Sequence, residues 1–215
     1  MGLLSKLFHR EKIVIVRGTG NTLPSFQDNN LKIFIDGNDN IISVTGKPFF
    51  LKSQISIEGN SNRIYINNIR YMRYSNIVIT GNNQTLQLSD NFSTEGTIFN
   101  MCSDFSECII GSDCMLASNT QIWSGDGHVI LDKATGRVLN AEHYKINIGS
   151  HVWIAEGTKI LKKAKIANNT IVGCNSVVTK PFLSPFCCIA GNPARIVSQN
   201  VSWERDSPFE YCFKQ

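Results

Sequence analysis

Apolar positions in the second half of the chain recur with a period of six residues. β-Branched side chains occupy every position of this hexad row without a miss, at Ile148, Ile154, Ile160, Ile166, Val172 and Val178. Neither the 3.6-residue period of a helix nor the alternation of a strand explains this spacing. A short strand followed by a tight corner does explain it, and three such hexads close one triangular coil. We therefore expect stacked coils whose β-branched side chains point to a common axis.

The same rhythm appears upstream and is then interrupted. The upstream positions that fit it are Ile98, Ile110, Leu116 and Ile122, with a miss at Asp104. From Ile122 to Ile148 the distance is 26 residues, which is not a multiple of six. The excess predicts a loop extruded from the coil at about residues 123–147. A regular scaffold that extrudes one polar loop usually carries its chemistry there.

Three related segments in the first half each predict a strand, a Gly-Asn turn and a second strand. Their glycines, Gly37, Gly59 and Gly81, are 22 residues apart. Gly and Asn tolerate the left-handed backbone that such turns require. These segments are therefore interpreted as further coils of the same solenoid.

The repeats together predict one all-β domain over residues 13–197, followed by a short C-terminal tail at residues 198–215. Residues 1–12 form a basic, amphipathic lead whose apolar stretch is too interrupted for a signal peptide. Two interpretations of the lead stay open: a terminal helix packed on the domain, or peripheral contact with an anionic membrane surface.

Composition narrows the class of protein further. The chain has 26 Ile and 22 Asn, and 18% charged residues, which favours short strands and polar turns over a helical bundle. The net charge of +4 comes without a Lys/Arg block, so we expect no nucleic-acid partner. The seven cysteines include no Cys-x-x-Cys pair. They predict reduced thiols in a cytoplasmic protein rather than a disulfide framework or a zinc site.

Three motifs in the second half identify a family resemblance. They are IGSHVWI at 148–154, NSVVTK at 175–180 and AGNPAR at 190–195, and they resemble the hexapeptide-repeat acyltransferases. That resemblance implies a left-handed parallel β-helix, a homotrimer, and acetyl-coenzyme A as acetyl donor without a metal. The Gly-Asn coils and the Ser-Gly-Asp-Gly-His loop most resemble bacterial capsular-polysaccharide O-acetyltransferases, including the polysialic acid type.

His128 is the first candidate for catalysis. A neutral alcohol is a poor nucleophile, and an imidazole has a suitable pKa to act as general base on a hydroxyl. His128 stands where the family's catalytic histidine stands; the alternative is a solvated loop histidine. Asp126 is predicted either to orient the imidazole or to bind an acceptor hydroxyl, and turn formation in a Gly-flanked loop is the competing interpretation.

The resemblance also implies residues for the cofactor groove. Trp153 matches a tryptophan that helps to line the active site, with ordinary packing as the alternative. Cys174 and Thr179 match positions along the pantetheine arm, largely through backbone atoms. Lys180 and Arg195 match basic positions near the phosphates of coenzyme A.

Three further charged residues lie near these positions in the sequence. We expect Lys162 and Lys163 to be solvated surface charges rather than phosphate ligands. Glu156 departs from the family pattern, because a carboxylate at that position does not favour a phosphate.

These residues predict an O-acetyltransferase acting on a surface carbohydrate, with acetylation of a small acceptor, such as a nucleotide-sugar amine or an antibiotic, as the alternative. The first-half coils carry a basic and aromatic group that would suit an acidic polymer: Arg63, Arg70, Tyr71, Arg73 and Tyr74. A longer trimer interface is the competing interpretation of these coils. A zinc-dependent carbonic anhydrase is disfavoured because His9, His128, His143 and His151 show no ligand spacing, and a noncatalytic scaffold is disfavoured by the extruded loop.

Overall fold

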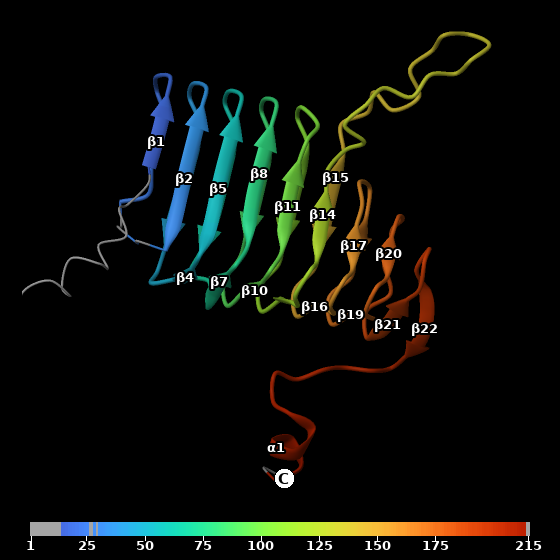
Figure 1. Cartoon of the computed structure of the whole chain (residues 1–215). Coiled ribbons are helices and arrows are strands. Elements are labelled where there is room, and N and C mark those ends of the chain that lie inside the picture. Colours follow the sequence, from blue (N-terminus) through green and yellow to red (C-terminus); the bar gives the residue numbers. More distant parts are fainter. Residues whose placement is uncertain (1–13, 26–27, 29, 214–215) are drawn as a thin grey trace, which may run out of the picture.

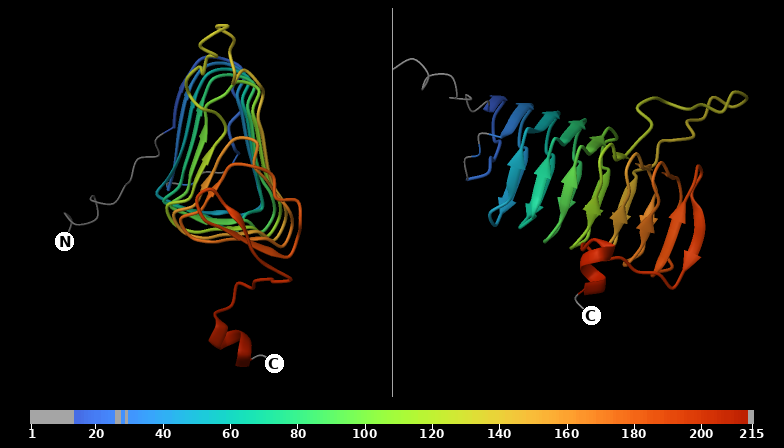
Figure 2. Two further views of the ribbon diagram at one scale, coloured as in Figure 1. Left: turned by 90° about the vertical axis from the view of Figure 1, so that its right-hand side faces the viewer. Right: turned by 60° about the horizontal axis from the view of Figure 1, so that its bottom comes forward.

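The chain forms the stacked coils that its repeats predict. The computed structural model describes residues 14–25, 28 and 30–213, so the predicted N-terminal lead lies outside the described residues. Each full coil contributes one strand to each of three sheets, which form the sides of a triangular prism around an apolar core (Figures 1 and 2). The prediction of an all-β, parallel β-helical solenoid is confirmed.

The three sheets share one direction of stacking. Sheet A contains β1 (Val14–Arg17), β2 (Leu31–Asp36), β5 (Ser53–Glu58), β8 (Asn76–Thr80), β11 (Ile98–Met101), β14 (Gln121–Trp123), β17 (Lys159–Ile160) and β20 (Val177–Val178). Sheet B contains β3 (Ile41–Thr45), β6 (Arg63–Asn67), β9 (Thr85–Leu88), β12 (Glu107–Ile110), β15 (Lys145–Ile148) and β18 (Lys165–Ile166). Sheet C contains β4 (Phe49–Leu51), β7 (Tyr71–Arg73), β10 (Ser93–Glu95), β13 (Met115–Leu116), β16 (Trp153–Ile154), β19 (Ile171–Val172), β21 (Cys187–Ala190) and β22 (Arg195–Gln199).

The hexad row lies in the core, as predicted, because all six of its side chains are buried. The upstream extension of the row is wrong at Ile98, which is 37% exposed, whereas Phe99 is fully buried. Paired residues of β8 and β11 are 22 positions apart, and those of β17 and β20 are 18 apart. A count in sixes therefore loses register in the longer coils of the first half.

The Gly-Asn turns form the corner between sheets A and B. Asn62 is fully buried there, and its amide donates to Asn40 Oδ1 (3.0 Å) and to the carbonyl of Gly81 (2.9 Å). Its Oδ1 accepts the backbone N–H of Gln84 (3.0 Å). Gly59 has a φ of 139°, and a Cβ at this position would lie 1.9 Å from the Gly81 carbonyl oxygen. The predicted turns are confirmed, and their amides stack one coil on the next.

The extruded loop leaves the solenoid at this same corner. It spans residues 124–144 between β14 and β15, within the predicted range of about 123–147, and projects beyond the prism (Figure 1). Ser124 at its root is fully buried. The Ser124 Oγ accepts the backbone N–H of Cys102 (2.9 Å) and a hydrogen bond from Ser106 Oγ (3.0 Å). The loop therefore starts from a fixed point in the corner.

The C-terminal tail turns back along the solenoid. β22 pairs antiparallel with β21, and the predicted domain boundary at residue 197 falls within β22. The chain then runs beneath sheet C to α1 (Pro208–Phe213) (Figures 1 and 2). Across the described ranges, no helix is long and apolar enough to cross a membrane.

Candidate functional site

A pocket of about 230 Å³ lies where the extruded loop meets the solenoid. Residues of the loop and of the preceding coil form its lining: Cys102, Ser103, Asp126, Gly127, His128, Val129, Val138, Asn140 and Tyr144. The pocket therefore contains both polar residues that the sequence predicted for catalysis, Asp126 and His128.

Asn140 joins the two arms of the loop beside His128. Its amide nitrogen donates to the His128 carbonyl (2.8 Å), and its Oδ1 accepts the backbone N–H of Ile130 (2.9 Å). The backbone of His128 is thus held, while its exposed imidazole makes no hydrogen bond to any residue that the structure describes. Sequence reasoning missed Asn140, because its partners lie on the other arm of the loop.

The Asp126 carboxylate is tied to the solenoid and to Asn140. Its Oδ2 accepts hydrogen bonds from the Lys162 ammonium and from Asn140 Nδ2 (2.8 Å). Partial burial raises the pKa of Asp126, but the hydrogen bonds from Lys162 and Asn140 outweigh it and leave the pKa below its ordinary value. Asp126 is therefore an ionised carboxylate at neutral pH, with both of these bonds on one of its two oxygens.

Lys162 and Lys163 both contact the second arm of the loop, Lys162 from a half-buried position and Lys163 from the surface. Lys162 donates to the Tyr144 hydroxyl (3.3 Å) and lies 4.5 Å from the centre of that ring. Lys163 pairs with Glu142 at 2.6 Å. The expectation of a solvated surface charge is wrong for Lys162, which is half-buried, because the loop folds onto the corner that carries it.

Trp153 lies on the opposite side of the prism from the loop. It begins β16 in sheet C, whereas the loop leaves at the corner between sheets A and B (Figure 2). Its ring centre is 6.2 Å from that of Trp203 in the C-terminal tail. One copy of the chain therefore separates His128 from the tryptophan predicted to line the same groove.

The residues predicted for the cofactor lie in the last coils, and all four are exposed. Cys174 follows β19 at the corner between sheets C and A, and Arg195 begins β22. Thr179 and Lys180 follow β20, at the same A/B corner as the loop but two coils further on. No hydrogen bond or shared pocket joins them to His128 within the described part of the chain.

The C/A corner also carries Glu156. Its carbonyl accepts the backbone N–H of Asn175 (2.8 Å), so Glu156 lies one coil before Cys174, and its side chain is exposed. The carboxylate that departs from the family pattern thus lies beside a residue predicted to line the cofactor arm.

The other described histidines have separate partners. The His143 ring packs edge-on against Phe105, with centres 5.0 Å apart, while His151 pairs with Asp113 at 2.7 Å. Among the residues that the structure describes, no group of three or more His, Cys, Asp or Glu is arranged to hold a metal ion.

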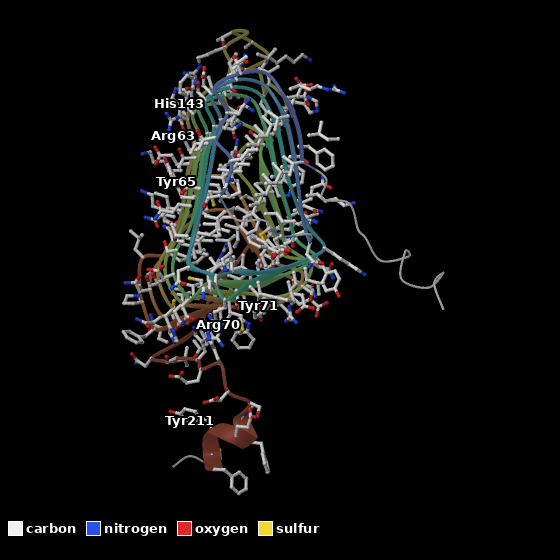
Figure 3. The ribbon with its side chains drawn as sticks, turned by 90° about the vertical axis from the view of Figure 1, so that its left-hand side faces the viewer. Arg63, Tyr65, Arg70, Tyr71, His143 and Tyr211 are labelled. Atoms are coloured by element: carbon white, nitrogen blue, oxygen red, sulfur yellow. The ribbon has the colours of Figure 1, made fainter. Side chains whose placement is uncertain are left out.

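The basic and aromatic group of the first half is divided between two sheets. Figure 3 shows Arg63 and Tyr65 on one side of the prism and Arg70 and Tyr71 at its base, where the tail lies. The expectation of one cluster is wrong for Arg63, which is in sheet B and donates to the Ser61 carbonyl (2.8 Å).

The remaining members of that group lie in or beside sheet C. Arg73 pairs with Glu95 (2.8 Å) and covers the Tyr71 ring at 4.3 Å. Arg70 donates to Asn91 Oδ1 (3.2 Å), and Arg205 of the tail donates to the carbonyl of the same asparagine (3.2 Å). The first-half coils and the tail therefore meet at this edge.

Comparisons of the sequence with known proteins find acetyltransferases, although no family model matches the chain. A polysialic acid O-acetyltransferase of Escherichia coli O1:K1 / APEC is 32% identical over 118 residues, which is 55% of this chain and 38% of that protein. A serine acetyltransferase of Staphylococcus epidermidis is 35% identical over 91 residues, or 42% of this chain and 39% of that protein. The chain thus spans about two fifths of the length of the curated relatives that it matches.

Solved structures extend the likeness to nearly the whole fold. The polysialic acid O-acetyltransferase OatWY has a TM-score of 0.75 and 26% identity, with 94% of this chain and 96% of that chain covered. The polySia-specific acetyltransferase NeuO has a TM-score of 0.65 and 22% identity, with 94% and 93% covered. The left-handed β-helix implied by the motifs agrees with these matches.

Proposed function

We propose that this chain, which has the motifs and the left-handed β-helix of the hexapeptide-repeat acyltransferases, transfers an acetyl group from acetyl-coenzyme A to a carbohydrate hydroxyl. The observation that carries the proposal is the imidazole of His128, which lines a pocket with its backbone held and its ring unbonded among the described residues. OatWY and the Escherichia coli relative are polysialic acid O-acetyltransferases, which favours a sialic-acid-containing polysaccharide as acceptor, and we take it to be a bacterial surface polysaccharide such as a capsule.

In the proposed reaction His128 transfers one proton. Acetyl-coenzyme A supplies the acetyl group as a thioester, which is already activated for attack. The neutral imidazole takes the proton of the acceptor hydroxyl as its oxygen bonds to the thioester carbon, and then gives that proton to the departing thiolate. No covalent bond between the protein and the acetyl group is needed, so a positioned base is the main requirement.

The residues around His128 supply that positioning. Asn140 fixes the His128 backbone, and Lys162 ties Asp126 to the solenoid. Both bonds to Asp126 reach Oδ2, which leaves Oδ1 to accept from the imidazole or from an acceptor hydroxyl. A base held this way reacts without first being ordered.

The last coils fit the phosphates of the donor in part. Lys180 and Arg195 are exposed and form no ion pair within the described residues, so both cations are available to phosphate oxygens. Cys174 and Thr179 are exposed near them and are assigned to the pantetheine arm. The Glu156 carboxylate would repel a phosphate beside it. We therefore assign the phosphates of coenzyme A to the coils that follow Glu156 in the sequence.

A homotrimer would complete the site. His128 and Trp153 lie on opposite sides of one copy, so a neighbouring copy is needed to bring them to one groove. The loop also exposes apolar side chains that a neighbour would cover, namely Val129, Ile130, Leu131, Val138 and Leu139. Cyclic closure with three copies satisfies each loop equally. We also propose that the protein is cytoplasmic, as its unpaired cysteines lead us to expect.

The test is acetylation of defined acceptors by the purified protein. Sialic acid oligomers, neutral oligosaccharides and nucleotide-sugar amines are each incubated with acetyl-coenzyme A, and thiol release is followed. We expect thiol release with a carbohydrate and a product acetyl group that alkali removes, as an ester requires. An alkali-stable amide on a nucleotide-sugar amine would instead establish the small-acceptor alternative.

A further inference from the structure

The C-terminal tail and the solenoid form a second, open pocket on the sheet C side of the solenoid. Its volume is about 530 Å³, and it lies between the tail and the outer face of β16 and β19. Its lining is Trp153, Ile171, Ser202, Trp203, Glu204, Asp206, Pro208, Tyr211 and Cys212. This pocket shares no lining residue with the pocket of His128.

The tail wall of this pocket is clamped to the solenoid by His151. Trp203 is only 5% exposed, and its indole N–H donates to the His151 carbonyl (2.9 Å). The two rings stack with centres 4.5 Å apart and an angle of 15°. His151 Nε2 lies 3.0 Å from the Trp203 carbonyl, and His151 Nδ1 lies 2.7 Å from Asp113 Oδ2. Each ring nitrogen of His151 thus faces an oxygen that can accept a hydrogen bond, one on Asp113 and one on the tail.

Arg205, two residues after Trp203, also anchors the tail to the solenoid. Its Nε donates to Asp113 Oδ1 (3.0 Å), and its Nη1 donates to Ser93 Oγ (2.9 Å). Trp203 and Arg205 therefore anchor the tail on either side of Glu204 in the sequence. This part of the wall, at residues 203–205, is pre-formed, which lowers the entropy that a ligand must lose on binding there.

The chemistry of the lining favours a sugar ring. The partly exposed Trp153 ring and the exposed Tyr211 ring of α1 are the aromatic surfaces that a ligand can reach. Trp203, which is 5% exposed and stacked on His151, supports Trp153 from behind, with ring centres 6.2 Å apart. Aromatic faces pack against the C–H faces of a pyranose, while the Ser202 hydroxyl and the Glu204 carboxylate can accept hydrogen bonds from its hydroxyls.

The same lining selects against anions. Glu204 contributes a carboxylate to the pocket, and among the described residues no Lys or Arg side chain lines it. A phosphate or a carboxylated sugar would meet like charge there. The volume of about 530 Å³ is within the range of small-molecule sites, so a single ring with its substituents fits.

We propose that this pocket binds an uncharged pyranose ring of the acceptor. The proposal rests on the carbohydrate transferase function above and adds the kind of sugar that one subsite accepts. Trp153 is shared between this pocket and the predicted acetyl-transfer groove, so in the proposed trimer a ring bound here places its neighbour in the glycan beside His128 of an adjacent copy.

The experiment measures binding in the absence of acetyl-coenzyme A. The protein is titrated with the methyl glycosides of glucose, galactose and N-acetylglucosamine, and with the methyl glycoside of sialic acid, by tryptophan fluorescence and by saturation-transfer NMR. We expect saturable binding of at least one neutral glycoside and none of the anionic one. The expected loss on Tyr211→Ala is about tenfold in affinity. Phe213→Ala is the matched control, because Phe213 is on the same helix, is 76% exposed and does not line the pocket.

Two results would overturn the proposal. Neutral glycosides that bind equally well to the wild type and to Tyr211→Ala would place any sugar site elsewhere. Coenzyme A binding that weakens in Tyr211→Ala, without neutral glycoside binding in the wild type, would assign the pocket to the donor. This experiment measures binding and not turnover, so the two proposals can fail independently. Sugar binding without thiol release would contradict the transferase function but not this pocket.

Discussion

Lys162 donates a hydrogen bond to Asp126 across 36 residues of sequence, from the corner between β17 and β18 to the root of the extruded loop. The two side chains are only 23% and 27% exposed, so solvent screens the pair less than a surface ion pair. The contact fixes the loop over the coil that follows it. The position of His128 therefore depends on a residue outside the loop.

Removing the Lys162 ammonium should slow turnover more than it weakens binding. Lys162→Met keeps the apolar stem and removes the charge, so the loop loses its bond to Asp126. We expect kcat to fall about tenfold, since small misplacements of a catalytic group are costly, while KM for acetyl-coenzyme A stays near the wild-type value. Lys163→Met is the control: its pair with Glu142 is solvent-exposed, and the change should be below about twofold. Equal losses in both variants would contradict the role of Lys162.

Acid should loosen the root of the loop. Burial raises the pKa of Asp126, but Lys162 and Asn140 outweigh it and hold the pKa below the ordinary 3.8. A carboxyl group with a depressed pKa stabilises the folded form fully above its unfolded value, and this contribution disappears as pH falls through the folded value. We expect hydrogen-exchange protection of the Ile130 amide to be constant near neutral pH and to fall below about pH 3.8. Asp126→Asn should remove this acid step, and an unchanged step in that variant would assign it to another group.

The Asp113 carboxylate should stabilise the docked tail. Burial raises its pKa, but hydrogen bonds from His151 and Arg205 outweigh that effect and lower it. Asp113→Asn weakens both charge-assisted bonds, so the free energy of unfolding should fall by about 1–3 kcal/mol, measured by urea denaturation. Asp36→Asn is the control, because its 3.6 Å pair with Arg17 is open to solvent and should contribute less than about 0.5 kcal/mol. A similar loss in both variants would show that the tail contacts add nothing specific.

Lys180 should act on the donor rather than on the acceptor. Charge reversal by Lys180→Glu places an anion near the proposed phosphate position, so KM for acetyl-coenzyme A should rise about tenfold. Arg195→Glu should have the same effect, and KM for the acceptor should not change in either. Lys47→Glu, at an exposed position in the first half of the chain, is the matched control. A rise confined to the acceptor KM would reverse the assignment.

The regular part of the fold could be predicted because its signals are local. The hexad row and the Gly-Asn turns repeat within a few residues of each other, and period and turn chemistry alone place them in the core and at corners. The one error in that row, Ile98, begins a coil of 23 residues, whereas a coil of the hexad row has 18. Counting in steps of six then assigns the core position to Ile98 instead of to its neighbour Phe99.

The contacts that position the site could not be predicted in the same way. Lys162 meets Asp126 at a separation of 36 residues, and Arg205 meets Asp113 at 92. No spacing rule links such pairs, because the loop and the tail each leave the repeat and return to it at points set by tertiary packing. His128 itself was found from its place in the interrupted repeat, whereas Asn140 had no signal beyond being polar.

The most direct measurement compares His128→Ala with His143→Ala under saturating acetyl-coenzyme A and acceptor. Both histidines lie in the segment between β14 and β15, but His143 packs on Phe105 and lines no part of the His128 pocket. If His128 is the general base, kcat for acetyl transfer should fall by about 10²–10⁴ in His128→Ala and stay near the wild-type value in His143→Ala, with both variants folded. A folded His128→Ala protein that retains wild-type turnover would contradict the proposed mechanism.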